Sequence, residues 1–360
     1  MKFEVEVTST INGNKWDSKL SESKSASTYQ SYGFANAYKT TYNSKPIFIL
    51  AKNNDGQIVG QLLAFIHSDY FWKDSNRFSK HLKKFIKFHS SLGWVYGPII
   101  HDEKNKNHII SEILNSIEKI AYENNILIIM GRTAPLESSI PLEIFKKNNY
   151  LIKEWGTYII DLQKSKEEIY KKMEKNIVRK TLKRSVERGV QIEEITDQNF
   201  KEYVDILNNF NIKTGRKVVS ANKIQDHLKP IQPTVNGFLT KINNIPTGGM
   251  MFFYFNNYIT EEGVARTKID ETEKFYSQDL IKLKIIEWGI KNKLNYYDLS
   301  GFNPNFESKK EEGIMLYKKK WGGTKLPYFI MTKIPNKTRY QLIRTLMNPE
   351  KLMSKIHVKF

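Results

Sequence analysis

The sequence contains no cysteine. Disulfides, thiol nucleophiles and cysteine metal ligands are therefore excluded from the chemistry of this chain. Its 7 histidines are scattered, and no HExxH or similar metal-binding spacing occurs. No metal is expected to take part in its function.

Long apolar runs are also missing. No stretch of the sequence approaches the roughly 20 apolar residues that a membrane-spanning helix needs. The N-terminal segment MKFEVEVTST lacks the apolar centre of a signal peptide. These features predict a soluble, cytoplasmic chain that touches a membrane at most peripherally.

Familiar nucleotide and hydrolase motifs are absent as well. The sequence has neither the GxGxxG of dinucleotide-binding folds nor the GxxxxGK[ST] of phosphate-binding loops. It also lacks the GxSxG of serine hydrolases. Any catalytic site must therefore be built from lysine, arginine, aspartate, glutamate, histidine or hydroxyl groups in another arrangement.

Acidic residues are in the minority. The 38 Asp and Glu face 57 Lys and Arg, which gives a net charge of +19. Two stretches concentrate the excess, 163–188 and 318–360. Such a balance favours a polyanionic partner such as RNA or an anionic membrane surface, although a general compositional drift would also produce it.

Length and composition point to two folded domains. The 360 residues exceed the usual size of one domain, and 40% hydrophobic with 12% aromatic residues suffices for two cores. Periodicity predicts helices over 14–44, 106–124, 142–148, 163–188, 200–213 and 273–292. It predicts strands over 2–7, 46–51, 57–66, 93–97, 126–130, 154–162, 191–194, 236–241, 248–255, 258–265, 296–299 and 326–331.

The two halves repeat one another weakly but in the same order. The segment NNDGQIVGQLLAFI (53–66) matches NNIPTGGMMFFYF (243–255), and AYENNILIIMG (121–131) matches GIKNKLNYYDLSG (289–301). A third pair joins 143–160 to 314–330, while 67–92 is an excursion found only in the first half. We interpret this order as a duplicated domain, each copy a mixed sheet with helices on its faces.

The stretch 296–323 carries the strongest sign of a site. A short strand ends at Asp298, a Ser-Gly turn follows, and a basic helix then leads to Trp321 and Gly322. Lys318 and its neighbour Tyr317 lie on that helix beside the Gly-Gly turn. This arrangement favours a binding site for an anionic group, with Lys318 as the cation, although a solvated helix face would give the same pattern.

Four stretches, taken in order, resemble the Fem peptidoglycan-bridge aminoacyltransferases, a two-domain branch of the GNAT-like acyltransferases. They cover nearly the whole chain. Trp16 with TYQSYGFANAY (28–38) resembles the opening helix pair of that family, and VYGPI (95–99) resembles its GP strand end. IYKKMEKNIVRKTLKRSVERGVQI (169–192) resembles its basic inter-domain helix, and YYDLSG (296–301) with LYKKKWGG (316–323) its closing pattern. The helical arm that some members insert has no counterpart here.

The resemblance implies an α/β (α+β) fold of two tandem GNAT-like domains, each a mixed central sheet flanked by helices. The expected domains are 1–165 and 189–360, joined by a basic helix over 166–188. The implied activity moves an amino acid from aminoacyl-tRNA to an amine of a peptidoglycan precursor, in a monomer without metal or other cofactor.

The resemblance also assigns residues. Lys318 maps onto the catalytic lysine of the closing motif, and Arg216 onto an arginine that binds the phosphate of the precursor. The tyrosine expected shortly afterwards is Ser220 here, which leaves the acceptor open. The aromatic and glycine positions of the closing motif, Tyr317, Trp321 and Gly322, are counted among the substrate-binding residues.

A general base and further anion contacts are less defined. Asp102 follows the GP strand end together with His101, and Asp298 ends the corresponding strand of the second half. Either carboxylate is a candidate base, although Asp serves as often in caps and turns, and a substrate-assisted mechanism stays open. Arg132, after the strand 126–130, is a further candidate for binding an anion.

Two other functions compete with this hypothesis. The first is an N-acyltransferase of the same fold, with an acyl-CoA donor and a sugar or lipid amine as acceptor. The segment RTKIDETEKFYSQDL (266–280) lacks the glycines of the usual acetyl-CoA loop, which makes that donor less favoured. A non-enzymatic RNA-binding or adaptor protein is the other.

Overall fold

The computed structural model describes residues 3–68, 91–137 and 139–347. Most of the 67–92 excursion and the last part of the basic stretch 318–360 lie outside these residues. The chain divides into two compact units. Unit 1 takes in 1–23, 38–153 and 329–360, and unit 2 takes in 24–37 and 154–328.

Unit 1 is built on a mixed sheet. Its strands lie in the order β1 (Glu4–Thr8), β2 (Lys45–Lys52), β3 (Ile58–His67), β4 (Ser91–Trp94), β6 (Ile128–Arg132) and the end of β13 (Thr324–Lys333), while β5 (Ile99–Ile100) pairs with β3. β4 and β6 run parallel, and the other neighbours whose register is known run antiparallel. Helices α1 (Gly13–Leu20), α4 (Lys106–Glu123), α5 (Leu142–Lys147) and α13 (Lys337–Met347) accompany it.

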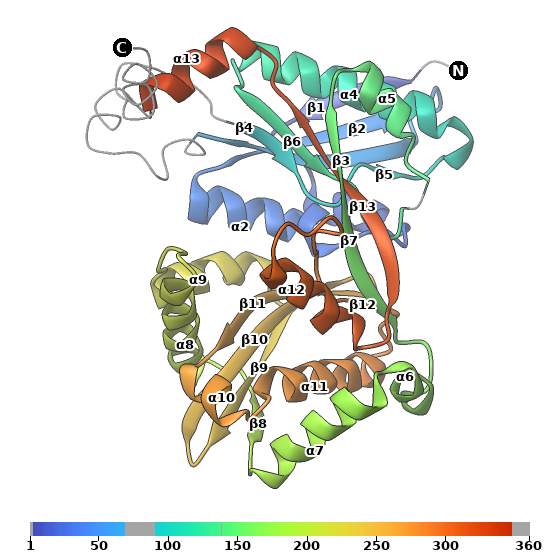
Figure 1. Cartoon of the computed structure of the whole chain (residues 1–360). Coiled ribbons are helices and arrows are strands. Elements are labelled where there is room, and N and C mark those ends of the chain that lie inside the picture. Colours follow the sequence, from blue (N-terminus) through green and yellow to red (C-terminus); the bar gives the residue numbers. More distant parts are fainter. Residues whose placement is uncertain (1–2, 69–90, 138, 348–360) are drawn as a thin grey trace. The chain divides into compact units, whose positions relative to one another are not determined.

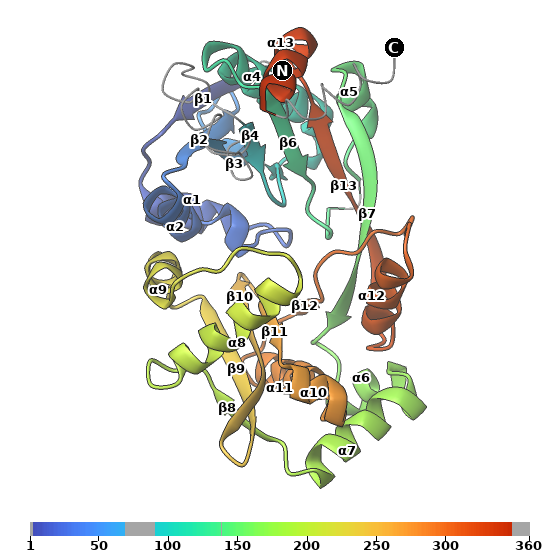
Figure 2. The ribbon, with the colours of Figure 1, turned by 60° about the vertical axis from the view of Figure 1, so that its left-hand side comes forward.

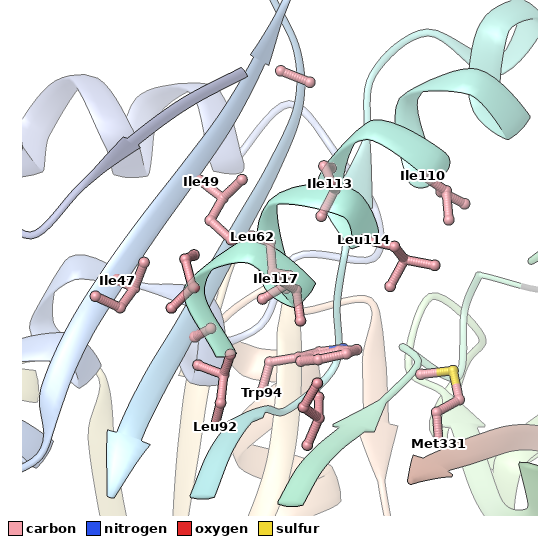
Figure 3. Packing of buried hydrophobic residues seen from close by; sticks show 14 of the residues in the cluster. Ile47, Ile49, Leu62, Leu92, Trp94, Ile110, Ile113, Leu114, Ile117 and Met331 are labelled. Atoms are coloured by element: carbon pink, nitrogen blue, oxygen red, sulfur yellow. The ribbon is translucent and has the colours of Figure 1, made fainter. Parts of the chain in front are cut away.

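Helix α4 covers this sheet because its apolar residues recur every three or four positions. Ile110, Ile113 and Ile117 are fully buried against the strands, as Figure 3 shows. Trp94 lies beside them over Gly131, where an added Cβ would meet the indole ring at 2.0 Å. The parallel pair β4–β6 can therefore carry this tryptophan only because its partner position is glycine.

Unit 2 repeats the plan. Its strands follow the order β7 (Leu151–Asp161), β12 (Tyr296–Asp298), β11 (Tyr258–Arg266), β10 (Ile245–Phe255), β9 (Val235–Ile242) and β8 (Gln191–Glu194), with β11 and β12 parallel (Figure 1). Helix α11 (Ser277–Lys291) and the pair α6 (Lys166–Lys172) and α7 (Lys180–Glu187) share a core with one face. Helix α8 (Phe200–Lys213) packs on the other face, since its Tyr203 contacts Gly249 while the adjacent Met250 points into that core (Figure 2).

The remaining elements of unit 2 connect these layers. Helix α9 (Ala221–Leu228) follows α8, α10 (Lys268–Glu273) precedes α11, and α12 (Lys309–Lys319) follows β12. A short 3-10 turn at Thr28–Gln30 belongs to this unit, and α2 (Tyr32–Tyr42) begins in unit 2 and ends in unit 1. The prediction of mixed sheets flanked by helices is confirmed for both units.

The last strand of each repeat is exchanged. β7, from the first half of the sequence, has its final residues 159–161 paired with β12 of unit 2. β13, from the second half, has residues 330–333 paired with β6 of unit 1. The expected boundary at residue 165 and a C-terminal domain running to 360 therefore differ from the observed units, because strand pairing carries 154–165 into unit 2 and 329–347 into unit 1.

Two predicted helices are interrupted. Residues 14–44 form α1, a 3-10 turn and α2 rather than one helix. The basic helix 163–188 breaks after α6, where Met173 is extended with ψ 148°, and resumes through a π-helical turn into α7. It ends before Gly189, whose φ of +74° is the left-handed conformation that glycine tolerates, as predicted.

Candidate functional site

The site lies where the two parallel strands of unit 2 stop running together. Their register ends at the pair Thr260 and Asp298; β12 finishes there, while β11 continues beside β10 to Arg266. The chain turns sharply at Ser300, which has a φ of +63°, and at Gly301. A Cβ on Gly301 would lie 2.1 Å from the hydroxyl of Tyr328, so the turn is possible only with glycine.

Lys318 reaches into this turn from α12. Its Nζ donates hydrogen bonds to the carbonyl oxygens of Ser300 at 2.8 Å and Gly301 at 2.9 Å. Burial, with a contribution from the Lys282 cation, lowers the pKa of Lys318 to about 8. An ammonium group has three N–H donors. Among the described residues two of these donors have protein acceptors, which leaves one donor for a ligand.

Asp298 supports the turn from below. Its fully buried carboxylate accepts hydrogen bonds from the hydroxyls of Thr157 and Tyr258 and from the backbone N–H of Ser300. Burial raises the pKa of this carboxyl group, which these hydrogen bonds and the Lys318 cation partly oppose. Asp298, a predicted candidate base, is thus enclosed by the protein, and its hydrogen bonds hold the turn in place.

Two buried ion pairs lie around α12. Glu261 of β11 pairs with Lys282 of α11 and accepts a hydrogen bond of 2.7 Å from the hydroxyl of Tyr297. Asp279 pairs with Lys320 at 2.8 Å through both of its oxygens. Both members of each pair are buried, so each charge is stabilised by its partner instead of by water.

The structure corrects the roles predicted for the closing motif. Trp321 is completely buried in the core of unit 2, and Gly322, with φ +72°, approaches the backbone of Lys172 so closely that a Cβ would lie 2.4 Å from its oxygen. Both are packing residues rather than substrate contacts. The ring of Tyr317 lies 4.2 Å from Nζ of Lys320, a lysine that is buried.

A second cluster lies on the α8 face of the same sheet. Glu262 accepts a hydrogen bond of 3.4 Å from the hydroxyl of Tyr29, and the exposed Arg216, in the loop after α8, acts electrostatically on its carboxylate. Desolvation by the surrounding protein atoms raises the pKa of the Glu262 carboxyl group, although the residue as a whole is exposed. Ser220, where the resemblance predicts tyrosine, caps α9.

The candidate site residues of unit 1 make contacts within the protein. Asp102 caps the turn Glu103–Asn105 by accepting from two backbone N–H groups and the Asn105 amide, the capping role left open above. Nε2 of His101 donates to the side-chain oxygen of Gln61 at 2.9 Å, and burial lowers the pKa of His101 to about 4. Arg132 is exposed at the end of β6, and its carbonyl accepts from Gly97.

Charge and cavities complete the description of unit 2. Helices α6 and α7, with the π-helical turn between them and the residue after α7, expose eight cations: Lys171, Lys172, Lys175, Arg179, Lys180, Lys183, Arg184 and Arg188. A cavity of about 660 Å³ between β8, β9 and α9 is lined by Glu194, Asp226 and Met251 among others, and holds none of the residues of the Lys318 site. Across residues 3–68, 91–137 and 139–347, no helix has the length and apolarity to cross a bilayer, and no group of acidic and histidine side chains has the geometry of a metal site.

Comparison with known proteins identifies the fold. The sequence matches no known family and no curated protein. The structure is similar to that of FemX, with a TM-score of 0.70 and 14% identity over 94% of this chain and 99% of that one. The chain has a Fem-type, GNAT-like fold.

Other solved structures share this fold at lower similarity. A tandem GNAT protein from the clavulanic acid biosynthesis pathway has a TM-score of 0.54 and 8% identity over 92% of this chain and 99% of that one. The C-terminal domain of a putative lysylphosphatidylglycerol synthetase from Agrobacterium fabrum has a TM-score of 0.52 and 10% identity over 92% and 95%. Because the sequence identities are this low, what these structures share with the chain is the Fem-type, GNAT-like fold.

Sequence reasoning missed the carboxylates around Lys318. A visible signal existed: two consecutive glutamates, Glu261 and Glu262, interrupt an otherwise apolar strand directly before a glycine. Charged residues adjacent in a strand point to opposite faces, so at least one must lie in a protein interior or a site. Asp279 and Lys282, three residues apart on a helix, carry no comparable signal because such pairs are common on exposed surfaces.

Proposed function

We propose that this protein is an aminoacyltransferase that moves an amino acid from aminoacyl-tRNA to an amine of a cell-wall precursor. The observation that carries the proposal is the Lys318 ammonium group, held by two backbone carbonyls at the open end of β12 with one donor uncommitted. The likeness of fold to FemX and to the lysylphosphatidylglycerol synthetase domains supports the same class of reaction.

The chemistry needs such a cation. When an amine attacks an ester carbonyl, the carbonyl oxygen gains negative charge in the tetrahedral intermediate. A fixed donor at that oxygen stabilises it by about 3–4 kcal/mol, because the donor is already oriented before the reaction. Lys318 fits this role because its two carbonyl partners fix Nζ. Asp298 accepts from the backbone N–H of Ser300, and the Thr157 hydroxyl donates to the Ser300 carbonyl, so both side chains hold the turn in place.

The donor end of the reaction is supported by charge. The cations exposed along α6 and α7 belong to the same unit as Lys318. Contacts of lysine and arginine with phosphates give affinity that does not depend on nucleotide sequence. We assign the RNA part of the donor to these exposed cations and the acceptor phosphate to Arg216.

The test is a transfer assay with labelled aminoacyl-tRNA and nucleotide-linked or lipid-linked amines as acceptors. Lys318→Met should lower kcat by roughly 100-fold or more, the loss typical of one oxyanion donor. Lys319→Met is the matched control, since this neighbouring lysine is exposed on the same helix. Equal activity of the two variants, or no product with any donor, would refute the proposal.

The same assay separates the competing function. The likeness to a tandem GNAT protein favours an acyl-CoA donor as the second candidate. Transfer from aminoacyl-tRNA is abolished by prior RNase treatment, whereas transfer from a thioester is not. Salt-dependent tRNA binding without transfer to any amine would instead favour a non-enzymatic RNA-binding protein.

A further inference from the structure

The proposed function makes no use of a buried ion pair that lies beside Lys318. Glu261 of β11 and Lys282 of α11 pair with each other, and these residues are only 7% and 2% exposed. A buried pair of this kind is weak evidence for stability, because apolar residues of similar volume often serve a fold as well or better. Its position next to the candidate cation points to a role at the site instead.

Hydrogen bonds connect the pair to the turn that holds Lys318. The Ser300 hydroxyl donates to the backbone carbonyl oxygen of Glu261 at 3.1 Å, and the Ser300 carbonyl accepts from Nζ of Lys318 at 2.8 Å. From α11, Nζ of Lys282 lies 5.6 Å from the ring centroid of Tyr317, the residue before Lys318. Both members of the pair therefore border the residues that position the lysine.

The two carboxylates near Lys318 are already occupied by other partners. Glu261 is paired with Lys282, and Asp298 accepts from two hydroxyls and a backbone N–H. Within the described part of the chain, the hydrogen bonds of the Lys318 ammonium group go to two carbonyl oxygens and to no carboxylate. Both carboxylates still attract the Lys318 cation electrostatically, whereas the Lys282 cation repels it.

The other titratable groups around this turn of α12 act on Tyr317. They come from β11, β12, α11 and the end of α12, and are Arg266, Tyr297, Asp279 and Lys320. Asp279 and Lys320 pair with each other, so their charges compensate. Among the described residues, Glu261 and Lys282 thus form the oppositely charged pair that acts on Lys318 itself.

We propose that Glu261 and Lys282 are positioning residues of the Lys318 site, and that their pairing cancels two charges beside Lys318 and leaves its ammonium group to the substrate. Without Lys282, Glu261 would compete with the oxyanion for the Lys318 cation. Without Glu261, the Lys282 cation would favour loss of the proton from Lys318. The catalytic consequence rests on the proposed aminoacyl transfer, whereas the balance of charges is a property of the folded protein.

Two conservative variants should move the titration of Lys318 in opposite directions. Lys282→Gln removes the repelling cation and leaves Glu261 without its partner, so the pKa of Lys318, about 8 in the wild type, should rise. Glu261→Gln removes the attracting anion and should lower that pKa. A charge within ~4–6 Å shifts a pKa by about 1–3 units, so we expect shifts of about one unit. In the double variant both charges are lost together, and the pKa should return close to the wild-type value.

Trace labelling with acetic anhydride measures this pKa without any substrate, because only the neutral amine reacts. The labelled fraction of the peptide that contains Lys318 is followed by mass spectrometry between about pH 6 and pH 10. The matched control is Lys166→Gln, which breaks an exposed pair with Glu287 on the same helix α11 and should leave the pKa unchanged. In the transfer assay, the fall in rate at high pH should move in the same direction as the labelling.

The two single variants decide the question by the sign of their shifts. Shifts in the same direction, or no shift in either variant, overturn the role of the pair. Each variant has its own predicted direction, so either one suffices if a thermal unfolding curve shows that the other does not fold. Opposite shifts in labelling without any transfer by the wild type would refute the proposed function and leave the balance of charges standing.

Discussion

Lys318 is a lysine whose protonation state matters near neutral pH. A free lysine side chain has a pKa of about 10.4, so at the cell's pH it would be charged in any case. Here burial brings the pKa to about 8, close enough that the cation is lost within the working range of an assay. The role as an oxyanion partner therefore has a measurable signature in pH.

The rate of transfer to hydroxylamine should fall above pH 8. The reaction needs the protonated Lys318 side chain to stabilise the oxyanion. The protonated fraction decreases about tenfold per pH unit once the pH exceeds the pKa of Lys318, which is about 8. Hydroxylamine is the acceptor of choice because its own protonation does not change in that range. The measurement is kcat between pH 6 and pH 10; a rate that keeps rising beyond pH 9 would contradict the cationic role.

A buried ion pair helps to hold the end of helix α12. Its residues 309–319 have no fully buried member, although Met315 packs on the core, and Lys320, directly after the helix, is buried against Asp279 and the ring of Tyr317. The Thr181 hydroxyl of α7 also donates to Asp279 at 2.7 Å. One carboxylate thus joins α7, α11 and the end of α12.

Breaking this pair on one side should be costly. Lys320→Met leaves the Asp279 carboxylate buried without its cation and should lower the free energy of unfolding by about 3–5 kcal/mol. The double variant Lys320→Met with Asp279→Leu should recover most of that loss. Urea unfolding measures both, with Lys319→Met as the exposed control; a loss below about 1 kcal/mol for Lys320→Met would contradict the pairing.

The exposed cations of α7 should set the salt dependence of RNA binding. For Lys180→Gln with Lys183→Gln, the slope of log affinity against log salt should fall in magnitude by roughly 1.5, about 0.7–0.9 per lost phosphate contact. Lys146→Gln with Lys147→Gln, an exposed pair on α5, is the control of equal charge. Fluorescence titration of tRNA between 50 and 200 mM salt measures the slope. An unchanged slope would place the RNA elsewhere.

The sequence was sufficient for the elements that depend on local pattern. The helix predicted over 106–124 and the strands predicted over 46–51, 57–66, 236–241 and 248–255 are all present. The motif also placed Lys318 beside the turn that follows Asp298, where it lies, while its catalytic role stays a prediction. What the sequence could not supply depends on distant partners: the pairing of Lys320 with Asp279, the enclosure of Asp298, and the packing of Trp321.

At the scale of the whole molecule, the exchanged strands make the two halves of the sequence interdependent. β6 depends on β13, which lies nearly two hundred positions later, and β12 depends on β7. Met331 of β13 also belongs to the buried core of unit 1, beside Trp94 (Figure 3). No division of the chain at a single peptide bond leaves both sheets complete.

Isolated halves should therefore fail to fold. A chain of residues 1–165 lacks β13, and we expect no cooperative urea transition from it, because β6 would be left with an unpaired edge and an open core. Appending residues 324–347 through a Gly/Ser linker should restore the transition. A sharp transition of the unextended half, with the same slope as the extended one, would contradict the interdependence.

The exchange also sets an order for folding during synthesis. Domains usually fold as they emerge from the ribosome, the N-terminal one first. Here the strand that completes unit 1 is made only after nearly all of unit 2, because β13 begins at Thr324. Unit 1 must wait, with the β6 edge open, until nearly all of unit 2 has been translated, so a nascent chain of this protein offers an exposed strand edge to chaperones while unit 2 is being made.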